Sequence, residues 1–232
     1  MRTVVVTDPP RADPDVAAAL GELGVATVHE TLGRAGYLGP AYRPAWAGAR
    51  AAGTAVTALC WPGDNLMVHV AVEQCRPGDF LVVATTSASE DGMFGELLAT
   101  SLQQRGVQGV VVAAGVRDVA ELRELRFPAW SRAVSAQGTV KATPGAVNVP
   151  VVVGGQGVAP GDIVVGDDDG VVVVPRLAAE AALAAARARV EKEQAAREAF
   201  RNGELGLDRY DLRDRLAGLG IEYVPYAEYR TS

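Results

Sequence analysis

Histidine and cysteine are scarce in this chain, which has two of each among its 232 residues. The histidines are His29 and His69, and the cysteines are Cys60 and Cys75. So few imidazole and thiolate donors exclude a metal cage of the structural-zinc type, and any metal chemistry must use carboxylates. Both cysteines lie in apolar surroundings and no signal peptide precedes them, so we expect buried free thiols in a reducing compartment.

Clusters of positive charge and long apolar runs are missing as well. The chain has 28 acidic and 22 basic residues, which gives a formal net charge of -6. Phosphate contacts need concentrated Lys and Arg, so we expect no nucleic-acid partner. No apolar run approaches the roughly 18 residues that span a bilayer, so we expect no membrane partner. Hydrophobic residues make up 49% of the chain, which is enough for a buried core, and we expect a globular cytoplasmic protein.

The central part of the chain predicts an α/β fold with a βαβα unit. A buried strand over 80–84 leads into a long polar, glycine-punctuated loop over 85–95. A helix over 96–105, a second buried strand over 107–114 and a helix from about 117 to 125 follow. Strands and helices that alternate at this length form parallel strands with right-handed crossovers.

The flanking segments complete one compact core with a helical C-terminal extension. Thr27 and Glu30 have the spacing of a capping box, which predicts that a second N-terminal helix begins at Thr27. Asp167-Asp168-Asp169-Gly170 predicts a β-hairpin turn. Further elements are expected as helices over 15–24, 66–73, 176–201 and 208–219, and as strands over 53–61, 130–135 and 151–154. We expect an α/β catalytic core over 1–175 and a helical extension over 176–232 that packs on the core or on a neighbouring subunit.

Two loop-to-helix junctions of the βαβα unit are expected to meet at one edge of the sheet. Glu96 begins one helix and Arg117-Asp118 begin the next, with twenty residues between Glu96 and Arg117. Asp118 and Glu96 are hard oxygen donors suited to Mg²⁺ or Mn²⁺, and Arg117 offers a positive fork for a carbonyl or carboxylate oxygen. The first-turn N–H groups of Leu97 and Leu98 are free to bind a carboxylate. The spacing alone favours a helix cap with a surface ion pair at Arg117-Asp118, and an ordinary first-turn acid at Glu96, because short motifs often occur by chance.

Other polar residues have weaker signals. Asn65 lies where a helix begins. It is expected either to contact the distal carboxylate of a substrate or to act as a plain N-cap. His29 and His69 are expected in helix packing or on the polar surface. Lys141 lies beyond the βαβα unit, so we expect no lysine at the two junctions and no Schiff-base chemistry.

The motifs around these residues resemble one enzyme family along nearly the whole chain. They include Gly-Glu96-Leu-Leu-Ala-Thr-Ser, Ala-Gly-Val-Arg117-Asp118, Ala-Gln-Gly-Thr139-Val-Lys141, Pro-Gly-Asp162-Ile-Val-Val and Gly-Glu204-Leu-Gly-Leu-Asp208. In these segments the chain is similar to the 4-hydroxy-4-methyl-2-oxoglutarate/4-carboxy-4-hydroxy-2-oxoadipate aldolases. The resemblance implies a β-β-α sandwich of swivelling-domain type, assembled as a homotrimer or homohexamer.

The resemblance also implies roles for individual residues. Asp118 would bind the divalent metal, Glu96 would assist through water, and Arg117 would contact the pyruvyl oxygen. The amides of Leu97 and Leu98 would hold the pyruvate carboxylate. An acid on the C-terminal helix of a neighbouring subunit would approach the site; Glu193 matches best, and Glu191 is the alternative.

We therefore expect a metal-dependent lyase that cleaves a 4-hydroxy-2-oxo acid to pyruvate and a second oxo acid. Oxaloacetate decarboxylation, which forms the same enolate, is an expected side activity. The alternatives are a lyase of the same mechanism on a different oxo acid, and a non-enzymatic regulator of ribonuclease E type. The resemblance implies that such regulators share this fold, but that they are shorter and lack the helical extension.

Overall fold

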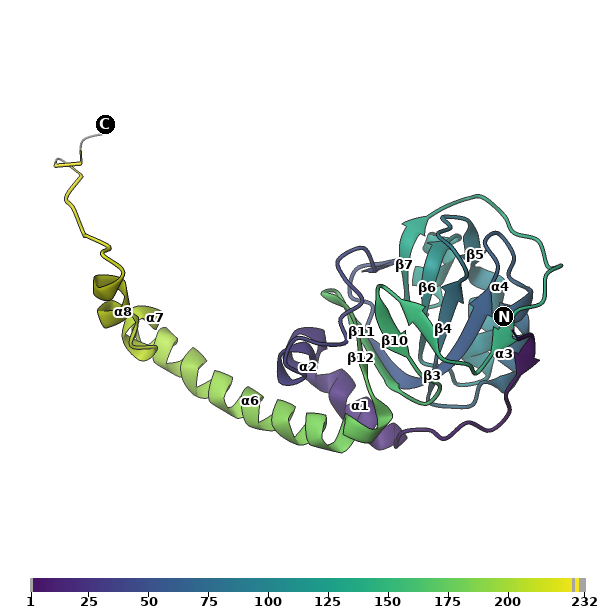
Figure 1. Cartoon of the computed structure of the whole chain (residues 1–232), viewed down its shortest axis with the longest axis horizontal. Helices are drawn as coiled ribbons and strands as arrows, with labels where there is room; N and C mark the ends of the chain where they lie inside the picture. Colours follow the sequence, from purple (N-terminus) through teal and green to yellow (C-terminus); the bar gives the residue numbers. More distant parts are fainter. Residues whose placement is uncertain (1, 227, 230–232) are drawn as a thin grey trace. The chain divides into compact units, whose positions relative to one another are not determined.

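The computed structural model describes residues 2–226 and 228–229. The first part of the chain, up to residue 188, forms a mixed α/β fold around one large sheet (Figure 1). The main path of that sheet runs in the order β1-β8-β3-β4-β6-β7-β2. Its strands are β1 (Val4–Val5), β8 (Ala146–Val147), β3 (Ala51–Cys60), β4 (Asp79–Thr85), β6 (Gly109–Val116), β7 (Ala129–Val134) and β2 (Arg43–Pro44). The four central strands β3, β4, β6 and β7 are parallel to one another.

The predicted βαβα unit is confirmed. Strand β4 leads through α4 (Glu96–Gln104) to β6, and β6 leads through α5 (Val119–Glu124) to β7. The expected loop over 85–95 was wrong in its last part, where β5 (Gly92–Phe94) pairs in parallel with β6. All three residues of β5 are buried, and buried backbone groups need a hydrogen-bonding neighbour, which the end of β6 supplies.

Alternating residues of the central strands face two different layers. On one face, Leu81, Val83, Val110 and Val112 pack against buried residues of α3 (Leu66–Gln74), α4 and α5. On the other face the core includes residues of β9 (Val151–Val153) and β10 (Gln156–Val158), which form a separate antiparallel pair. The β-branched runs make these strands almost fully buried, as parallel strands covered on both faces are.

A hairpin extends the sheet and carries the N-terminal helices. Strands β11 (Ile163–Asp167) and β12 (Gly170–Val174) pair antiparallel across Asp168-Asp169, which confirms the predicted turn, and β11 also pairs with β3. Helices α1 (Pro14–Leu23) and α2 (Val25–Thr31) share a buried cluster with this hairpin and lie beside it (Figure 1).

The predicted helix start at Thr27 was wrong. Helix α2 begins at Val25, and no side chain of the helix caps it. Instead the Val25 N–H donates to Asp167 Oδ2 of the hairpin at 2.8 Å. A carboxylate 142 residues away in the chain therefore replaces the expected local capping box.

The chain divides into two compact units, residues 1–188 and 189–232. Helix α6 (Ala179–Arg201) follows a short 3₁₀ turn, η1 (Arg176–Ala178), and its first turns belong to the first unit, where Ala182, Leu183 and Ala186 are buried. The prediction of one continuous helix over 208–219 was wrong, because two short helices occupy this segment. Asp211 adopts a left-handed conformation with φ of 52° and separates α7 (Gly206–Arg209) from α8 (Leu212–Gly218).

Candidate active site

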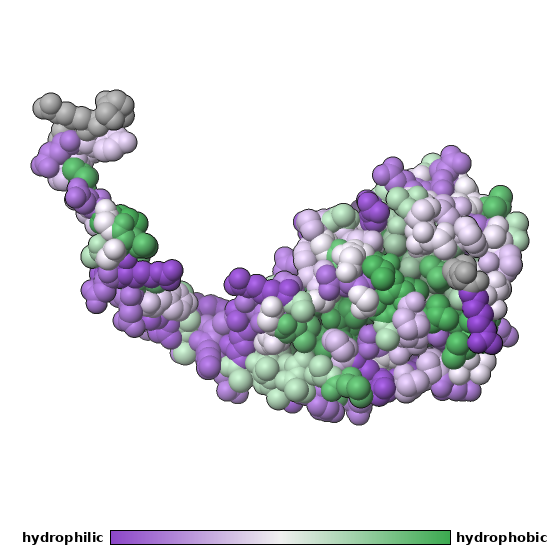
Figure 2. All heavy atoms as spheres, in the orientation of Figure 1, coloured by the Kyte–Doolittle hydropathy of each residue, from purple (hydrophilic) through white to green (hydrophobic). Residues whose placement is uncertain are grey.

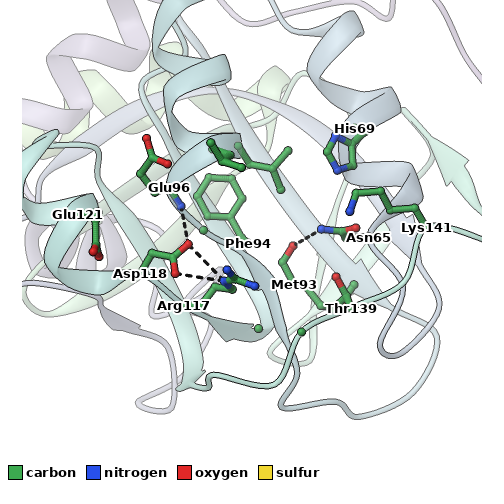
Figure 3. A pocket seen from close by; sticks show the side chains of 15 residues that line it. Asn65, His69, Met93, Phe94, Glu96, Arg117, Asp118, Glu121, Thr139 and Lys141 are labelled. Carbon is green, nitrogen blue, oxygen red and sulfur yellow. Dashed lines mark hydrogen bonds and ion pairs between the residues drawn. The ribbon is translucent and has the colours of Figure 1, made fainter.

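A cavity of about 550 Å³ opens in the first unit, where α4, α5 and α3 begin. Figure 3 shows Glu96, Arg117, Asp118 and Glu121 on one side of this cavity and Asn65, His69, Thr139 and Lys141 on the other, with Met93 and Phe94 between them. The two predicted junctions do meet here, because β5 and β6 deliver the start of α4 and the start of α5 to the same edge of the sheet.

Asp118 does not cap its own helix. It occupies the residue before α5 in a left-handed conformation, with φ of 56° and ψ of 42°, and its side chain accepts no bond from α5. Its Oδ2 instead accepts a hydrogen bond of 3.1 Å from the Glu96 N–H at the start of α4. A left-handed non-glycine residue is uncommon and such conformations collect at functional sites. The helix-cap part of the alternative for Arg117-Asp118 was therefore wrong, whereas the ion pair that it included is present at 3.1 Å.

Arg117 lies against this carboxylate. Its Nε–H donates to Asp118 Oδ1 at 3.1 Å and to Oδ2 at 3.3 Å. Its terminal guanidinium nitrogens donate no hydrogen bond to any of the described residues. Both side chains are partly exposed, 49% for Arg117 and 30% for Asp118. The guanidinium of Arg117 is thus held by Asp118 through Nε, and its two terminal nitrogens are free to donate to an oxygen of a ligand in the cavity.

Gly95 makes this approach possible. A Cβ atom at position 95 would lie 2.4 Å from Asp118 Oδ2 and 2.9 Å from the Arg117 Cγ. Both distances are shorter than any ordinary contact, so a side chain at Gly95 would displace the Asp118 carboxylate. Gly95 therefore permits the close approach of Asp118 and Arg117 to the start of α4.

The start of α4 presents unpaired backbone donors. The Ala99 N–H is the first to bond within the helix, to the Gly95 carbonyl, so the N–H groups of Leu97 and Leu98 precede the helical ladder. The Leu97 side chain is 82% exposed and the Leu98 side chain is buried. Glu96 Oε1 accepts a hydrogen bond of 2.9 Å from the Thr100 hydroxyl, which fixes one of its two oxygens.

The donor set on this side fits a hard divalent cation. In the part of the chain that the structure describes, no three His, Cys, Asp or Glu residues come together as a metal cage. Mg²⁺ is commonly bound by one or two carboxylates and keeps several waters. Asp118 and Glu96, which line the same cavity, supply carboxylates of that kind and number.

The opposite side carries residues whose place the sequence did not reveal. Lys141 and His69 both line the cavity, on the side opposite the two junctions (Figure 3). His69 is exposed, as expected for a residue of the polar surface. Partial burial and the charge of Lys141 lower the pKa of His69 below its ordinary 6.5, which favours the neutral imidazole.

Asp64 holds the segment that carries Lys141. Its Oδ1 accepts from the Leu66 N–H at 2.9 Å, and its Oδ2 accepts from Ala142 and Thr143 N–H at 2.9 and 2.6 Å. A further backbone bond of 3.0 Å joins the Asn65 N–H to the Val140 carbonyl. These contacts pin residues 140–143 to the start of α3, a link between distant parts of the chain that no local pattern could have signalled.

Asn65 is not a helix cap by its side chain. It precedes α3 without a capping bond, and Asp64 makes the bond to Leu66 instead. Asn65 is buried, with an exposed fraction of 7%, and its Nδ2 donates to the Met93 carbonyl at 3.1 Å. Its Oδ1 is buried without a hydrogen-bond partner among the described residues. Contact with a distal carboxylate stays a prediction.

Glu193 belongs to the second unit and is not among the residues that line this cavity. On α6 it forms ion pairs with Arg189 at 2.7 Å and Arg197 at 3.7 Å. Its role at a neighbouring subunit's site, and the alternative choice of Glu191, stay predictions.

The remaining expectations concern cysteine and the membrane. Cys60 and Cys75 are buried free thiols, as predicted, and burial raises the pKa of each to about 12. Across the described residues, every helix is too short or too polar to cross a bilayer.

The sequence of this chain is similar to those of known proteins. Residues 15–173 match a family model described as RraA-like, Aldolase/RraA. A Halalkalibacterium halodurans protein named "Putative 4-hydroxy-4-methyl-2-oxoglutarate aldolase" is 30% identical over 158 residues, which cover 68% of this chain and 75% of that protein. A Thermus thermophilus protein named 4-hydroxy-4-methyl-2-oxoglutarate aldolase is 33% identical over 112 residues, which cover 48% of this chain and 68% of that one.

A solved structure with a different name is similar as well. The crystal structure of Streptomyces coelicolor RraAS2, described as an unusual member of the RNase ES inhibitor RraA protein family, matches with a TM-score of 0.74 and 30% sequence identity. The match covers 82% of this chain and 99% of that one.

Proposed function

The chain belongs to the RraA-like, Aldolase/RraA family, and on this premise we propose that it is a divalent-metal-dependent aldolase. Its substrate would be 4-hydroxy-4-methyl-2-oxoglutarate or 4-carboxy-4-hydroxy-2-oxoadipate, cleaved to pyruvate and a second oxo acid. One observation carries the proposal: Asp118 turns away from its own helix to meet Arg117 and the start of α4 at a cavity. A protein-binding surface has no need of this arrangement.

The residues of the first wall suit a 2-oxo acid. The N–H groups of Leu97 and Leu98 would bind the carboxylate at the positive end of α4, and Arg117 would donate to the 2-oxo oxygen. Mg²⁺ or Mn²⁺, held by Asp118 with help from Glu96 through water, would supply a Lewis acid that polarises this carbonyl. Asp118 also orients Arg117 through the bonds to Nε.

The reaction is a retro-aldol cleavage. The C4 hydroxyl gives up its proton as C4 becomes a carbonyl, the C3–C4 bond breaks, and its electron pair forms the pyruvate enolate. Arg117 stabilises the negative charge that develops on the 2-oxo oxygen, a contribution of several kcal/mol for a well-placed donor. A proton added at C3 completes pyruvate. In oxaloacetate the same bond breaks with loss of CO₂, which accounts for the proposed decarboxylase side activity.

The proposal extends to the assembly, the architecture and the location. Self-association as a homotrimer or homohexamer is supported by an apolar area on the viewed face of the first unit (Figure 2). Exposed apolar residues of that unit include Val5, Val6, Val152 and Leu177, and surfaces of this kind often bind another chain. The proposed architecture is the β-β-α sandwich of swivelling-domain type, and the proposed location is the cytoplasm.

The test is pyruvate release from 4-hydroxy-4-methyl-2-oxoglutarate and from oxaloacetate, measured with added Mg²⁺ and again with excess EDTA. We expect release from both compounds that EDTA abolishes and Mg²⁺ restores. No metal-dependent pyruvate from either compound would exclude this function.

A second candidate is supported by the name of one similar structure. The likeness to Streptomyces coelicolor RraAS2 favours a regulator that binds a ribonuclease of the E type. An RNA-cleavage assay with such a ribonuclease, with and without this protein, separates the two: inhibition that persists in Asp118→Asn would favour the regulator.

A further inference from the structure

Thr100 lies on α4, one helical turn after Glu96, and is not among the residues that line the cavity. Its hydroxyl donates a hydrogen bond of 2.9 Å to Glu96 Oε1. Residues four positions apart lie on the same face of a helix, which brings these two side chains together. Thr100 is therefore linked to the site through the carboxylate of Glu96.

This bond is not the one that a threonine usually makes within a helix. The hydroxyl of a helical threonine commonly bonds to the backbone carbonyl three or four residues earlier. Thr31 does so in α2, where its hydroxyl donates to the Val28 carbonyl at 2.8 Å. Thr100 donates to a side chain instead. The orientation of its hydroxyl therefore serves the Glu96 carboxylate and not the helix backbone.

Glu96 is held at both of its ends. Its backbone N–H donates to Asp118 Oδ2 at 3.1 Å, and its side chain accepts from Thr100 through Oε1. Oε2 accepts no hydrogen bond from the described residues, so this oxygen remains for a donor in the cavity. A glutamate side chain loses much conformational freedom when it is fixed. Because Thr100 fixes it beforehand, that loss does not weaken the binding of a ligand.

We propose that Thr100 is a positioning residue for the divalent cation. It holds Glu96 so that Oε2 accepts a hydrogen bond from a water of the cation that Asp118 binds. This deepens the proposed function and rests on it, because there Glu96 assists the cation through water. Partners that orient the groups around a metal ion contribute to its affinity without contacting it, and Thr100 acts in this way through Glu96.

The test is titration of the full chain with Mn²⁺ without substrate, in which electron paramagnetic resonance of the free ion gives the dissociation constant. Thr100→Val keeps the shape of the side chain and removes the hydroxyl. We expect the affinity for Mn²⁺ to fall about 3–10-fold, less than the roughly 10–100-fold typical of a group that holds a direct ligand. Thr100→Ser, which restores a hydroxyl, should bind Mn²⁺ within about 2-fold of the wild type.

Glu96→Ala supplies the decisive comparison. In this background Thr100 has no carboxylate to hold, so Thr100→Val should change the Mn²⁺ affinity by less than about 2-fold. A merely structural role of Thr100 would lower the affinity equally in both backgrounds, and that result overturns the proposal. An unchanged affinity in Thr100→Val alone, or no recovery in Thr100→Ser, overturns it as well.

Ser101→Ala is the matched control. Ser101 is exposed on the same helix and outside the cavity lining, so the loss of its hydroxyl should leave the Mn²⁺ affinity within about 2-fold of the wild type. A fall equal to that of Thr100→Val contradicts the role of the bond to Glu96. Thermal melts of all variants verify that each is folded.

Pyruvate release from 4-hydroxy-4-methyl-2-oxoglutarate distinguishes the two levels. Coupling between Thr100 and Glu96 in Mn²⁺ binding, without pyruvate release by the wild type, contradicts the aldolase and keeps the positioning role. Metal-dependent pyruvate release without this coupling contradicts the positioning role alone. A wild type that binds no Mn²⁺ contradicts both.

Discussion

At the scale of single residues, Asp118 decides how the site is built. A helix-capping aspartate bonds to the amides of its own helix, whereas Asp118 accepts from Glu96 N–H on another helix and from Arg117 Nε. The left-handed backbone at Asp118, with φ of 56°, is what turns the carboxylate that way. One residue thereby joins the two loop-to-helix junctions.

The variant Asp118→Asn tests this role. The amide oxygen can still accept from Glu96 N–H, but the negative charge that holds a divalent cation and orients Arg117 is lost. We expect the kcat for pyruvate release to fall by about 100-fold or more, with a thermal midpoint within about 3 °C of the wild type. A coupled lactate dehydrogenase assay and circular dichroism measure the two quantities. Turnover close to that of the wild type would remove Asp118 from the mechanism.

Gly95→Ala tests the close approach between α4 and Asp118. The added methyl would lie 2.4 Å from Asp118 Oδ2, so the carboxylate and Arg117 must move. We expect a loss of about 1–3 kcal/mol in the free energy of unfolding and a large fall in kcat, measured by urea denaturation and by pyruvate release. Gly157→Ala is the control, because a Cβ there meets no atom within 4 Å; similar losses in both variants would contradict the explanation.

At the scale of elements, the most informative contact is the one between the start of α3 and the segment 140–143. Asp64 is 3% exposed and accepts three backbone N–H bonds. Partial desolvation raises its pKa, but the bonds from Leu66, Ala142 and Thr143 lower it by more, so the pKa lies below 3.8. The charged form of Asp64 is therefore favoured in the folded protein.

Asp64→Asn should loosen this contact. The new amide can place an NH₂ group where Asp64 Oδ2 accepts from the Ala142 and Thr143 N–H groups, so these two hydrogen bonds would be lost. We therefore expect the free energy of unfolding to fall by about 2 kcal/mol at pH 7. Because the folded-state pKa is depressed, this stabilisation is present above the unfolded pKa. It is lost as the pH falls through 3.8 to the folded pKa.

Urea denaturation of the wild type and of Asp64→Asn from pH 7 to pH 3 measures this. The difference between them should stay constant above about pH 5 and shrink below it. Asp214→Asn, a change at an exposed residue of α8, should show no such dependence. A difference that grows as the pH falls would contradict the sign of the shift.

At the scale of the whole molecule, the proposed oligomer and the role of Glu193 are one prediction. The cavity is lined by first-unit residues only, and Glu193 belongs to the second unit. If Glu193 serves a neighbouring subunit, Glu193→Gln lowers kcat by about 10–100-fold, and Glu191→Gln does not. Light scattering after gel filtration should give three or six copies per particle.

Co-expression with Asp118→Asn makes the test sharper. A mixed oligomer would contain sites that combine an intact Asp118 with an intact Glu193 from the neighbour. We expect it to regain part of the wild-type activity, although each variant alone is impaired. An active monomer, or no recovery in verified mixed oligomers, would contradict action across an interface.

Local patterns were sufficient for much of the fold. The buried runs of β4 and β6, which alternate with helices at short spacing, predicted a parallel βαβα unit, because elements that alternate at this length form parallel strands. The same patterns failed where a distant residue takes a local role. Asp167 caps α2 in place of Thr27, and buried β5 bonds to the end of β6 in a segment that reads as a polar loop.

The sequence by itself determined that Glu96, Arg117 and Asp118 meet at one sheet edge, because parallel strands end side by side and the spacing returns the chain there. Only the tertiary structure decided that Asp118 accepts from α4 and that Lys141 and His69 face the same cavity. The physical reason is that these contacts join segments distant in the chain. Asp64, for example, bonds to residues 78 and 79 positions away, and no local periodicity encodes a pairing of that range.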